Sequence, residues 1–255
     1  MKVLAAAVLS LCALGAQADK PVRLLLVGDS TLAPRNGYGD ALCAHFQPGL
    51  QCLNLAKNGR SSGSYRAEGS WQQVIALLQS NADFSATYVM IEFGHNDQPG
   101  KPGRSTDLKT EFPVNLARYV DEVRATGATP VLATPLTRRS FKDGLLVDDL
   151  GLWAEATRTV AQDRHVPLVD LLAASRKAVQ AMGQAEADTL AVEPPVSAAA
   201  ASAPQSLNAV EAVTTKRSAF DRTHVGPKGA ALFANIVAPL LREAVPALAP
   251  QLKPE

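Results

Sequence analysis

Residues 22–31 read Val22-Arg23-Leu24-Leu25-Leu26-Val27-Gly28-Asp29-Ser30-Thr31, an apolar run that ends in a glycine, a carboxylate and two hydroxyls. A short apolar run that ends in such residues is typical of a buried strand followed by a loop. We therefore predict a strand over Val22–Val27. Ser30 should follow it at the N-terminal approach to a helix, where backbone N–H groups favour negative charge.

The rest of the chain alternates similar runs with amphipathic segments. Further strands are expected over Gln51–Leu55, Tyr88–Phe93, Thr129–Ala133 and Val166–Asp170, and helices over Gly37–Phe46, Trp71–Gln79, Leu108–Thr126, Asp149–Asp163 and Pro227–Ala244. Continuously apolar strands separated by helices indicate an α/β fold with a parallel sheet of five strands, covered on both faces. Loops at the carboxyl ends of such strands gather functional groups at one edge of the sheet.

Composition agrees with one globular domain over residues 19–255. The chain has 255 residues, of which 47% are hydrophobic, so a large core can form without metals. The net charge of +1 gives no sign of nucleic acid or an anionic membrane surface as a partner. We expect a monomer with no stable insertion into a membrane.

The first 18 residues have the features of a cleavable signal peptide. Lys2 precedes the apolar stretch Val3–Gly15, and Ala16-Gln17-Ala18 provides a small-x-small cleavage site. We predict export to the periplasm or out of the cell. In an oxidising compartment the two remaining cysteines, Cys43 and Cys52, can form a disulfide, although two small buried hydrophobic residues are the alternative.

One segment lacks a helical or strand period. From about Ala185 to Thr215 the chain is rich in Ala, Ser, Pro and Val. This composition predicts a flexible insertion in the single domain, and its place just before Asp221 leaves open that it covers the site.

Ser30 and two residues near the other end of the chain could form a nucleophilic site. Asp221-Arg222-Thr223-His224 places a carboxylate and an imidazole three positions apart. A serine hydroxyl needs a base, and Asp221 could fix the tautomer of His224 so that this histidine acts as that base. The oxyanion of an acyl-transfer reaction could be held by backbone N–H groups near Ser30, by a backbone N–H of the Asn58-Gly59 turn and by the side-chain amide of Asn96.

Other interpretations of these residues remain open. Residues 59–63 match G-x-S-x-G, which would make Ser61 the nucleophile, but a loop-like segment follows where that motif requires a helix. Ser30 could instead cap a helix. No two of the four histidines have metal-ligand spacing, so we predict no metal site, and no phosphate-binding glycine motif is present.

Four blocks in this order resemble the SGNH hydrolases, also called the GDSL esterases and lipases. They are Gly28-Asp29-Ser30-Thr31, Asn58-Gly59-Arg60-Ser61, Gly94-His95-Asn96-Asp97 and Asp221-Arg222-Thr223-His224. Within this family the sequence is similar to the rhamnogalacturonan acetylesterase branch, in having Thr31 after Ser30, the run Gly59-Arg60-Ser61-Ser62 and Phe93 before Gly94-His95-Asn96-Asp97. The resemblance implies a flavodoxin-like three-layer α/β/α sandwich and no cofactor. It also implies Ser30, Asp221 and His224 as the triad and Ser30, Gly59 and Asn96 as the oxyanion hole.

The substrate class rests on the charge of the loops. Cationic side chains outnumber acidic ones in the predicted site loops, and arginine suits carboxylate recognition. We expect Arg60, Arg66 and His95 to contact an acetylated pectic polymer, whose galacturonate units carry carboxylates. Solvated loop charges are the alternative for these cations. The enzyme could also act on acetylated xylan, small esters, thioesters or lysophospholipids, or be a non-catalytic carbohydrate-binding protein.

Overall fold

The computed structural model describes residues 20–193 and 220–254. The predicted signal peptide and most of the predicted insertion lie outside these ranges. Among the helices of the described residues, none is long and apolar enough to cross a membrane.

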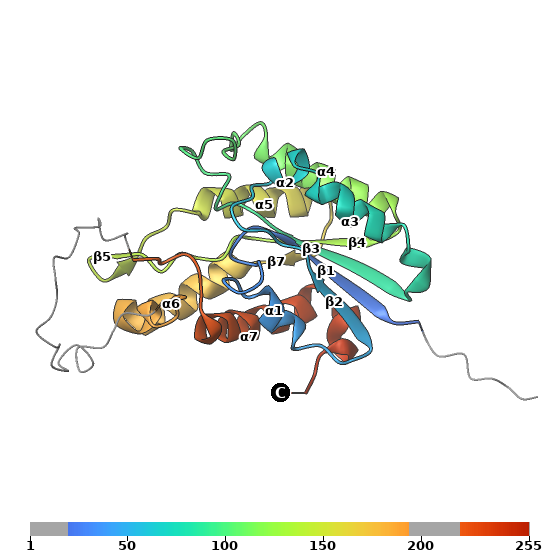
Figure 1. The fold of residues 1–255 in the computed structure, drawn as a ribbon. Helices are drawn as coiled ribbons and strands as arrows, with labels where there is room; N and C mark the ends of the chain where they lie inside the picture. The colour runs from blue at the N-terminus through green and yellow to red at the C-terminus, as the bar shows by residue number, and fades with distance from the viewer. Residues whose placement is uncertain (1–19, 194–219, 255) are drawn as a thin grey trace, which may run out of the picture.

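A single parallel sheet forms the centre of the molecule (Figure 1). Its strands are β1 (Val22–Gly28), β2 (Leu50–Asn54), β3 (Ala86–Glu92), β4 (Thr129–Ala133) and β7 (Leu168–Val169). Their order, β2-β1-β3-β4-β7, is the flavodoxin-like order, so the predicted five-stranded parallel sheet is confirmed. Gly28 pairs with Glu92, which brings the carboxyl ends of β1 and β3 level with each other.

Alternate residues of β1 face two separate helical layers. Leu25 and Val27 pack in the cluster formed with α3 (Ser70–Leu78), α4 (Phe112–Ala125) and α5 (Gly151–Asp163). Leu24 and Leu26 pack against α1 (Gly39–Cys43), α6 (Leu171–Asp188) and α7 (Pro227–Ala244) on the other face, as Figure 1 shows. Burial on both faces explains why this strand is continuously apolar.

Several elements are shorter than the sequence predicts. Helix α1 starts only at Gly39, because residues 29–38 form turns. Helix α4 starts at Phe112, because the Asp107 carboxylate accepts the N–H groups of Lys109 and Thr110 and so stabilises a separate turn. Strand β7 ends at Val169, because Asp170 caps α6 by accepting the N–H of Ala173.

Helix α6 corrects the predicted start of the low-complexity insertion. The helix continues to Asp188 across a non-helical Gly183, and Ala187, Leu190 and Ala191 are buried. Residues 185–193 therefore belong to the folded domain. The remainder of the predicted insertion, from residue 194 to 215, lies outside the described residues.

The smaller elements complete the fold. They are α2 (Ser64–Ala67), the hairpin of β5 (Phe141–Lys142) and β6 (Leu145–Leu146), and 3-10 helices over Asn81–Asp83 and Pro246–Gln251. Cys43 and Cys52 are joined by a disulfide with a Cα–Cα distance of 5.4 Å. The disulfide ties the end of α1 to β2.

Candidate active site

The structure brings Ser30, His224 and Asp221 into one hydrogen-bonded chain. The Oγ of Ser30 lies 2.7 Å from Nε2 of His224, and Nδ1 of the same ring lies 2.8 Å from Oδ2 of Asp221. Asp221 also accepts the backbone N–H of Thr223 and of His224 through Oδ1. Burial alone raises the pKa of Asp221, but these bonds outweigh it and hold the pKa below the ordinary value. An ionised Asp221 keeps the proton of neutral His224 on Nδ1 and leaves Nε2 free to accept the serine proton.

Ser30 lies in a tight turn and not directly before a helix, which corrects the sequence expectation. The carbonyl of Asp29 accepts the N–H groups of Leu32 and Ala33, and the Asp29 carboxylate accepts the N–H of Thr31. The next helix begins nine residues after Ser30, at Gly39. The turn itself, and not a helix dipole, orients the hydroxyl.

A buried arginine holds the loop that carries Asp221 and His224. The guanidinium of Arg139 donates to the carbonyl oxygens of Asp221, Thr223 and His224. Its backbone N–H also binds the carbonyl of Arg222 at 2.9 Å. Burial lowers the pKa of Arg139 to about 10, which still leaves it charged at neutral pH.

The end of α6 supports the same loop from the other side. Arg222 makes two 2.9 Å bonds to the carboxylate of Asp188, and Ala191 forms a β-bridge with Val225. The N–H of Val225 in turn binds the carbonyl of Asn36, downstream of Ser30. Residues near the predicted insertion therefore position the catalytic loop.

The loops that carry the three predicted oxyanion donors follow the neighbouring strands β1, β2 and β3, and the N–H of Lys57 binds the carbonyl of Gly28 at 3.0 Å. Neither the N–H of Ser30 nor that of Gly59 donates to any residue that the structure describes. Gly59 has φ +74°, a left-handed conformation that favours glycine. Asn96 uses one amide hydrogen on the carbonyl of Arg60, at 3.0 Å, and keeps the second available.

Asp97 fixes the two oxyanion loops relative to each other. Its carboxylate accepts the N–H of Ser62 at 3.0 Å, the hydroxyl of Ser62 at 2.5 Å and the hydroxyl of Thr106 at 2.9 Å. Burial raises the pKa of Asp97 to about 6. Because Ser62 follows Gly59 closely and Asp97 adjoins Asn96, these bonds set the spacing of the two donors.

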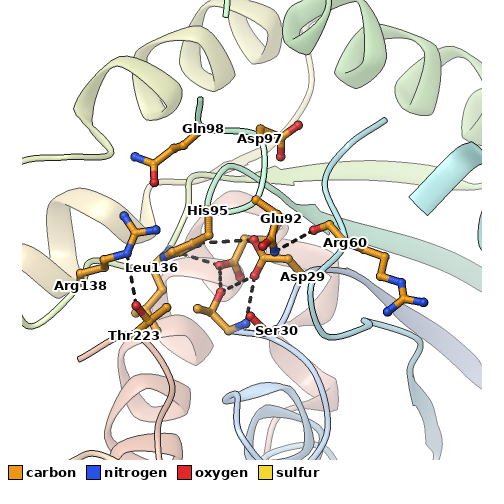
Figure 2. A network of polar contacts seen from close by, with 12 residues as sticks. Asp29, Ser30, Arg60, Glu92, His95, Asp97, Gln98, Leu136, Arg138 and Thr223 are labelled. Carbon is orange, nitrogen blue, oxygen red and sulfur yellow. Dashed lines mark hydrogen bonds and ion pairs between the residues drawn. The ribbon is translucent and has the colours of Figure 1, made fainter. Parts of the chain in front are cut away.

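A buried polar network lies behind the nucleophile. Figure 2 shows Asp29, Glu92 and His95 facing one another beside Ser30. Nδ1 of His95 lies 3.4 Å from Oδ2 of Asp29. Oε2 of Glu92 accepts from the hydroxyl of Tyr38, and Oε1 accepts the N–H of Leu136 and lies 3.0 Å from the hydroxyl of Thr31.

Burial and the charge of Asp29 raise the pKa of Glu92 to about 8. Burial also opposes the ionisation of Asp29, but the neighbouring His95 and the bonds from Thr31 hold the Asp29 pKa below its ordinary value. The two carboxyl groups therefore differ in charge near neutral pH: Asp29 is ionised and Glu92 holds a proton.

Asp29, Glu92 and His95 offer three ligand-type atoms within 4.8 Å of one another. Oδ2 of Asp29 and the ring nitrogens of His95 have no hydrogen-bond partner among the described residues. Both oxygens of Glu92, however, already accept an O–H or N–H group, and a cation would displace these donors and the proton of Glu92. The donor set therefore fits a proton-sharing network better than a metal site.

Three other candidates are placed differently from the sequence expectation. Arg66 pairs with Glu122 at 2.6 Å, stacks on Tyr119 and is only 12% exposed, so its charge is compensated and it stabilises the α3–α4 layer. His95 is 2% exposed and belongs to the buried network, where it contacts Asp29. Arg60 is exposed but pairs with Glu68 at 2.7 Å.

The alternative nucleophile lacks a base. Ser61 is fully buried, its hydroxyl binds the hydroxyl of Ser64 at 3.1 Å, and its oxygen accepts the N–H of Ser64 at the start of α2. Among the described residues no histidine contacts it. Ser61 therefore has a structural role.

Comparisons with known proteins agree with this geometry. Residues 26–232 match the model of the GDSL-like Lipase/Acylhydrolase family. The chain is 34% identical over 181 residues to the rhamnogalacturonan acetylesterase RhgT of Bacillus subtilis, covering 68% of this chain and 75% of that one. It is 30% identical over 156 residues to YesY of the same organism, described as a probable rhamnogalacturonan acetylesterase, covering 58% and 70%.

Solved structures share the fold. The Bacillus subtilis protein YxiM superposes with a TM-score of 0.66 at 19% identity over 91% of this chain, which spans 59% of that protein. A catalytic mutant of Axe2, an acetylxylan esterase from Geobacillus stearothermophilus, superposes with a TM-score of 0.56 at 16% identity, covering 88% of this chain and 94% of that one. The chain belongs to the GDSL-like lipase/acylhydrolase family. It is a serine ester hydrolase.

Proposed function

We propose that this protein removes O-acetyl groups from an acetylated polysaccharide, with rhamnogalacturonan as its preferred substrate. The observation that carries the proposal is the Ser30–His224–Asp221 chain of hydrogen bonds, at 2.7 and 2.8 Å, in a protein 34% identical to a rhamnogalacturonan acetylesterase.

The geometry supports a two-step acyl transfer. His224 takes the proton of Ser30 as the hydroxyl attacks the acetyl carbonyl, and Asp221 stabilises the resulting imidazolium. The N–H groups of Ser30 and Gly59 and the free amide hydrogen of Asn96 stabilise the tetrahedral oxyanion. His224 then protonates the departing sugar oxygen. Water hydrolyses the acetyl-enzyme in the second step, with His224 again as the base.

Release of acetate from purified polymers tests the substrate. Acetylated rhamnogalacturonan, acetylated xylan and a long-chain lipid ester are compared at equal ester concentration, with the Ser30→Ala variant as the blank. We expect the highest kcat/KM on rhamnogalacturonan. A higher kcat/KM on xylan or on the lipid would contradict the preference, and no acetate from any polymer would contradict the proposal as a whole.

Export is a second part of the proposal. The sequence of residues 1–18 supports it, and so does the Cys43–Cys52 disulfide, because disulfides persist in oxidising compartments. The full chain is expressed in a bacterial host, and the amino terminus of the product is determined by mass spectrometry in each cell fraction. A periplasmic or secreted product that begins at Asp19 is expected. A cytoplasmic product that keeps Met1 would refute export.

A further inference from the structure

Arg104 lies at the oxyanion edge without a carboxylate partner. Its Nη1 lies 3.4 Å from Oδ1 of Asn96. The same nitrogen lies close to the backbone of Gly59, because a Cβ atom added to that glycine would be 3.4 Å from it. The side chain is exposed, and no carboxylate of the described residues lies within ion-pair distance of it. An uncompensated guanidinium thus lies beside two of the oxyanion donors.

The acidic groups near Arg104 are engaged elsewhere. Asp97 is buried and binds Ser62 and Thr106, while Glu68 pairs with Arg60. The remaining acids have backbone partners as well: Asp107 accepts two N–H groups of its own turn, and Glu111 accepts the N–H of Asp107 at 2.6 Å. The positive charge of Arg104 is therefore left for a ligand.

The loop that carries Arg104 is preorganised. Lys101 accepts the N–H groups of Arg104 and Ser105 through its carbonyl, and the N–H of Thr106 binds the carbonyl of Asp97 at 2.9 Å. The hydroxyl of Ser105 binds back to the carbonyl of Gln98 at 2.8 Å. A fixed loop lowers the entropy cost of ordering the arginine when a ligand binds.

A groove of about 380 Å³ extends from Arg104 between α2 and the start of α4. Its lining includes Ser64, Thr106 and Asn115, together with the carboxylate of Glu111 and the exposed Val114. Hydroxyls, an amide and a guanidinium are the groups that bind sugar hydroxyls and a carboxylate.

We propose that Arg104 and this groove form a uronate subsite, in which the guanidinium binds the carboxylate of a galacturonate unit while an acetyl group lies at Ser30. This inference rests on the proposed function and adds to it the group that recognises the anionic polymer. It assigns the carboxylate contact to Arg104 and not to Arg66, whose guanidinium is already paired with Glu122. Arg104 is in this view a specificity-determining residue, since it distinguishes an acidic sugar from a neutral one.

Competitive inhibition of 4-nitrophenyl acetate hydrolysis tests the subsite with galacturonate and galactose as the probes. For the unmodified protein we expect galacturonate to inhibit about tenfold more strongly than galactose, since a charge-assisted bond at an exposed site is worth about one factor of ten. Arg104→Gln should reduce this ratio to about one, and Arg104→Lys should keep part of it. Arg118→Gln, the same change on the exposed face of α4, should leave the ratio as it was.

Three results would overturn the inference. One is equal inhibition by the two sugars in the unmodified protein. Another is an unchanged ratio in Arg104→Gln. The third is a loss of kcat/KM in Arg104→Gln that is as large on 4-nitrophenyl acetate as on acetylated rhamnogalacturonan. Arg104 would then act only through its contact with Asn96 and not through the carboxylate of the substrate. If acetate is released from rhamnogalacturonan in any of these cases, the proposed function stands and only the subsite fails.

Discussion

Asn96→Ala tests the oxyanion hole more directly than any other single change. The variant removes the side-chain amide of the proposed oxyanion hole, together with its 3.0 Å bond to the carbonyl of Arg60 and its 3.4 Å contact with Arg104. The backbone donors of Ser30 and Gly59 stay. The nucleophile and its base are untouched.

The expected loss of turnover in Asn96→Ala is larger than its expected loss of stability. Loss of one oxyanion donor lowers kcat by about 10²–10³, or roughly 2.7–4 kcal/mol of transition-state stabilisation. Loss of a neutral hydrogen bond in the folded state costs about 0.5–1.5 kcal/mol, which shifts Tm by only a few degrees in a domain of this size. The variant should therefore stay folded at assay temperature while losing turnover.

Steady-state kinetics on 4-nitrophenyl acetate and thermal unfolding of the same samples give both quantities. We expect a lower kcat with a KM changed by less than about threefold, because the donor acts on the transition state and not on the bound ester. Asn81→Ala is the matched control, since Asn81 also donates an amide hydrogen to a carbonyl, that of Thr126 at 2.8 Å, and accepts from an arginine, but it precedes the amino end of β3, whereas Asn96 follows the carboxyl end. A kcat loss below about tenfold in Asn96→Ala, or an equal loss in Asn81→Ala, would refute the oxyanion assignment.

Three further changes test other parts of the account. Asp221→Asn should lower kcat by roughly 10³–10⁴, since the amide no longer stabilises imidazolium; a loss below tenfold in steady-state assays would show that this 47% exposed carboxylate is dispensable. Glu92→Gln should change the pH dependence of unfolding. Glu92 has a pKa of about 8 in the folded protein and about 4.3 in the unfolded chain. Between these values only the folded state holds the proton. The free energy of unfolding therefore falls as pH rises through this window, by at most about 1.4 kcal/mol per pH unit. In urea titrations the free energy of unfolding of Glu92→Gln should rise relative to that of the native protein between pH 5 and pH 8. The same dependence of unfolding free energy on pH in both proteins would contradict this. Reduction of Cys43–Cys52 should lower the unfolding free energy by about 2–3 kcal/mol, because the disulfide closes a short loop; an unchanged urea midpoint with dithiothreitol would contradict it.

The sequence predicts the sheet well because its strands are buried on both faces. Continuous apolar runs such as Val22–Val27 have few alternative structures, and the polar residues after them mark the strand ends. Because Ser30 and Asn96 follow the ends of two such strands, they are predicted at the same edge of the sheet. His224 and Asp221 are predicted as the partners of Ser30 because their spacing of three positions suits one turn.

Other features depend on contacts between distant residues, which local patterns do not reveal. Arg66 reads as a loop cation, but its partner Glu122 lies 56 positions away on α4. Helix α6 was missed because its alanine-rich turns resemble the low-complexity segment that follows and because Gly183 interrupts it.

Two supporting residues left different traces in the sequence. Glu92 is a carboxylate inside an otherwise apolar run, and that is a signal of a buried polar network. Arg139 has no such signal, since Thr137-Arg138-Arg139 reads as an ordinary exposed loop. Only the fold shows that its guanidinium holds the loop of Asp221 and His224.

Covalent labelling with a fluorophosphonate tests the central assignment most directly. The reagent phosphonylates a serine that an adjacent base activates, and peptide mass spectrometry identifies the labelled residue. We expect label on Ser30 alone, no label in Ser30→Ala, and full label in Ser61→Ala. Label on Ser61, or label that survives in Ser30→Ala, would contradict the assignment of Ser30 as the nucleophile.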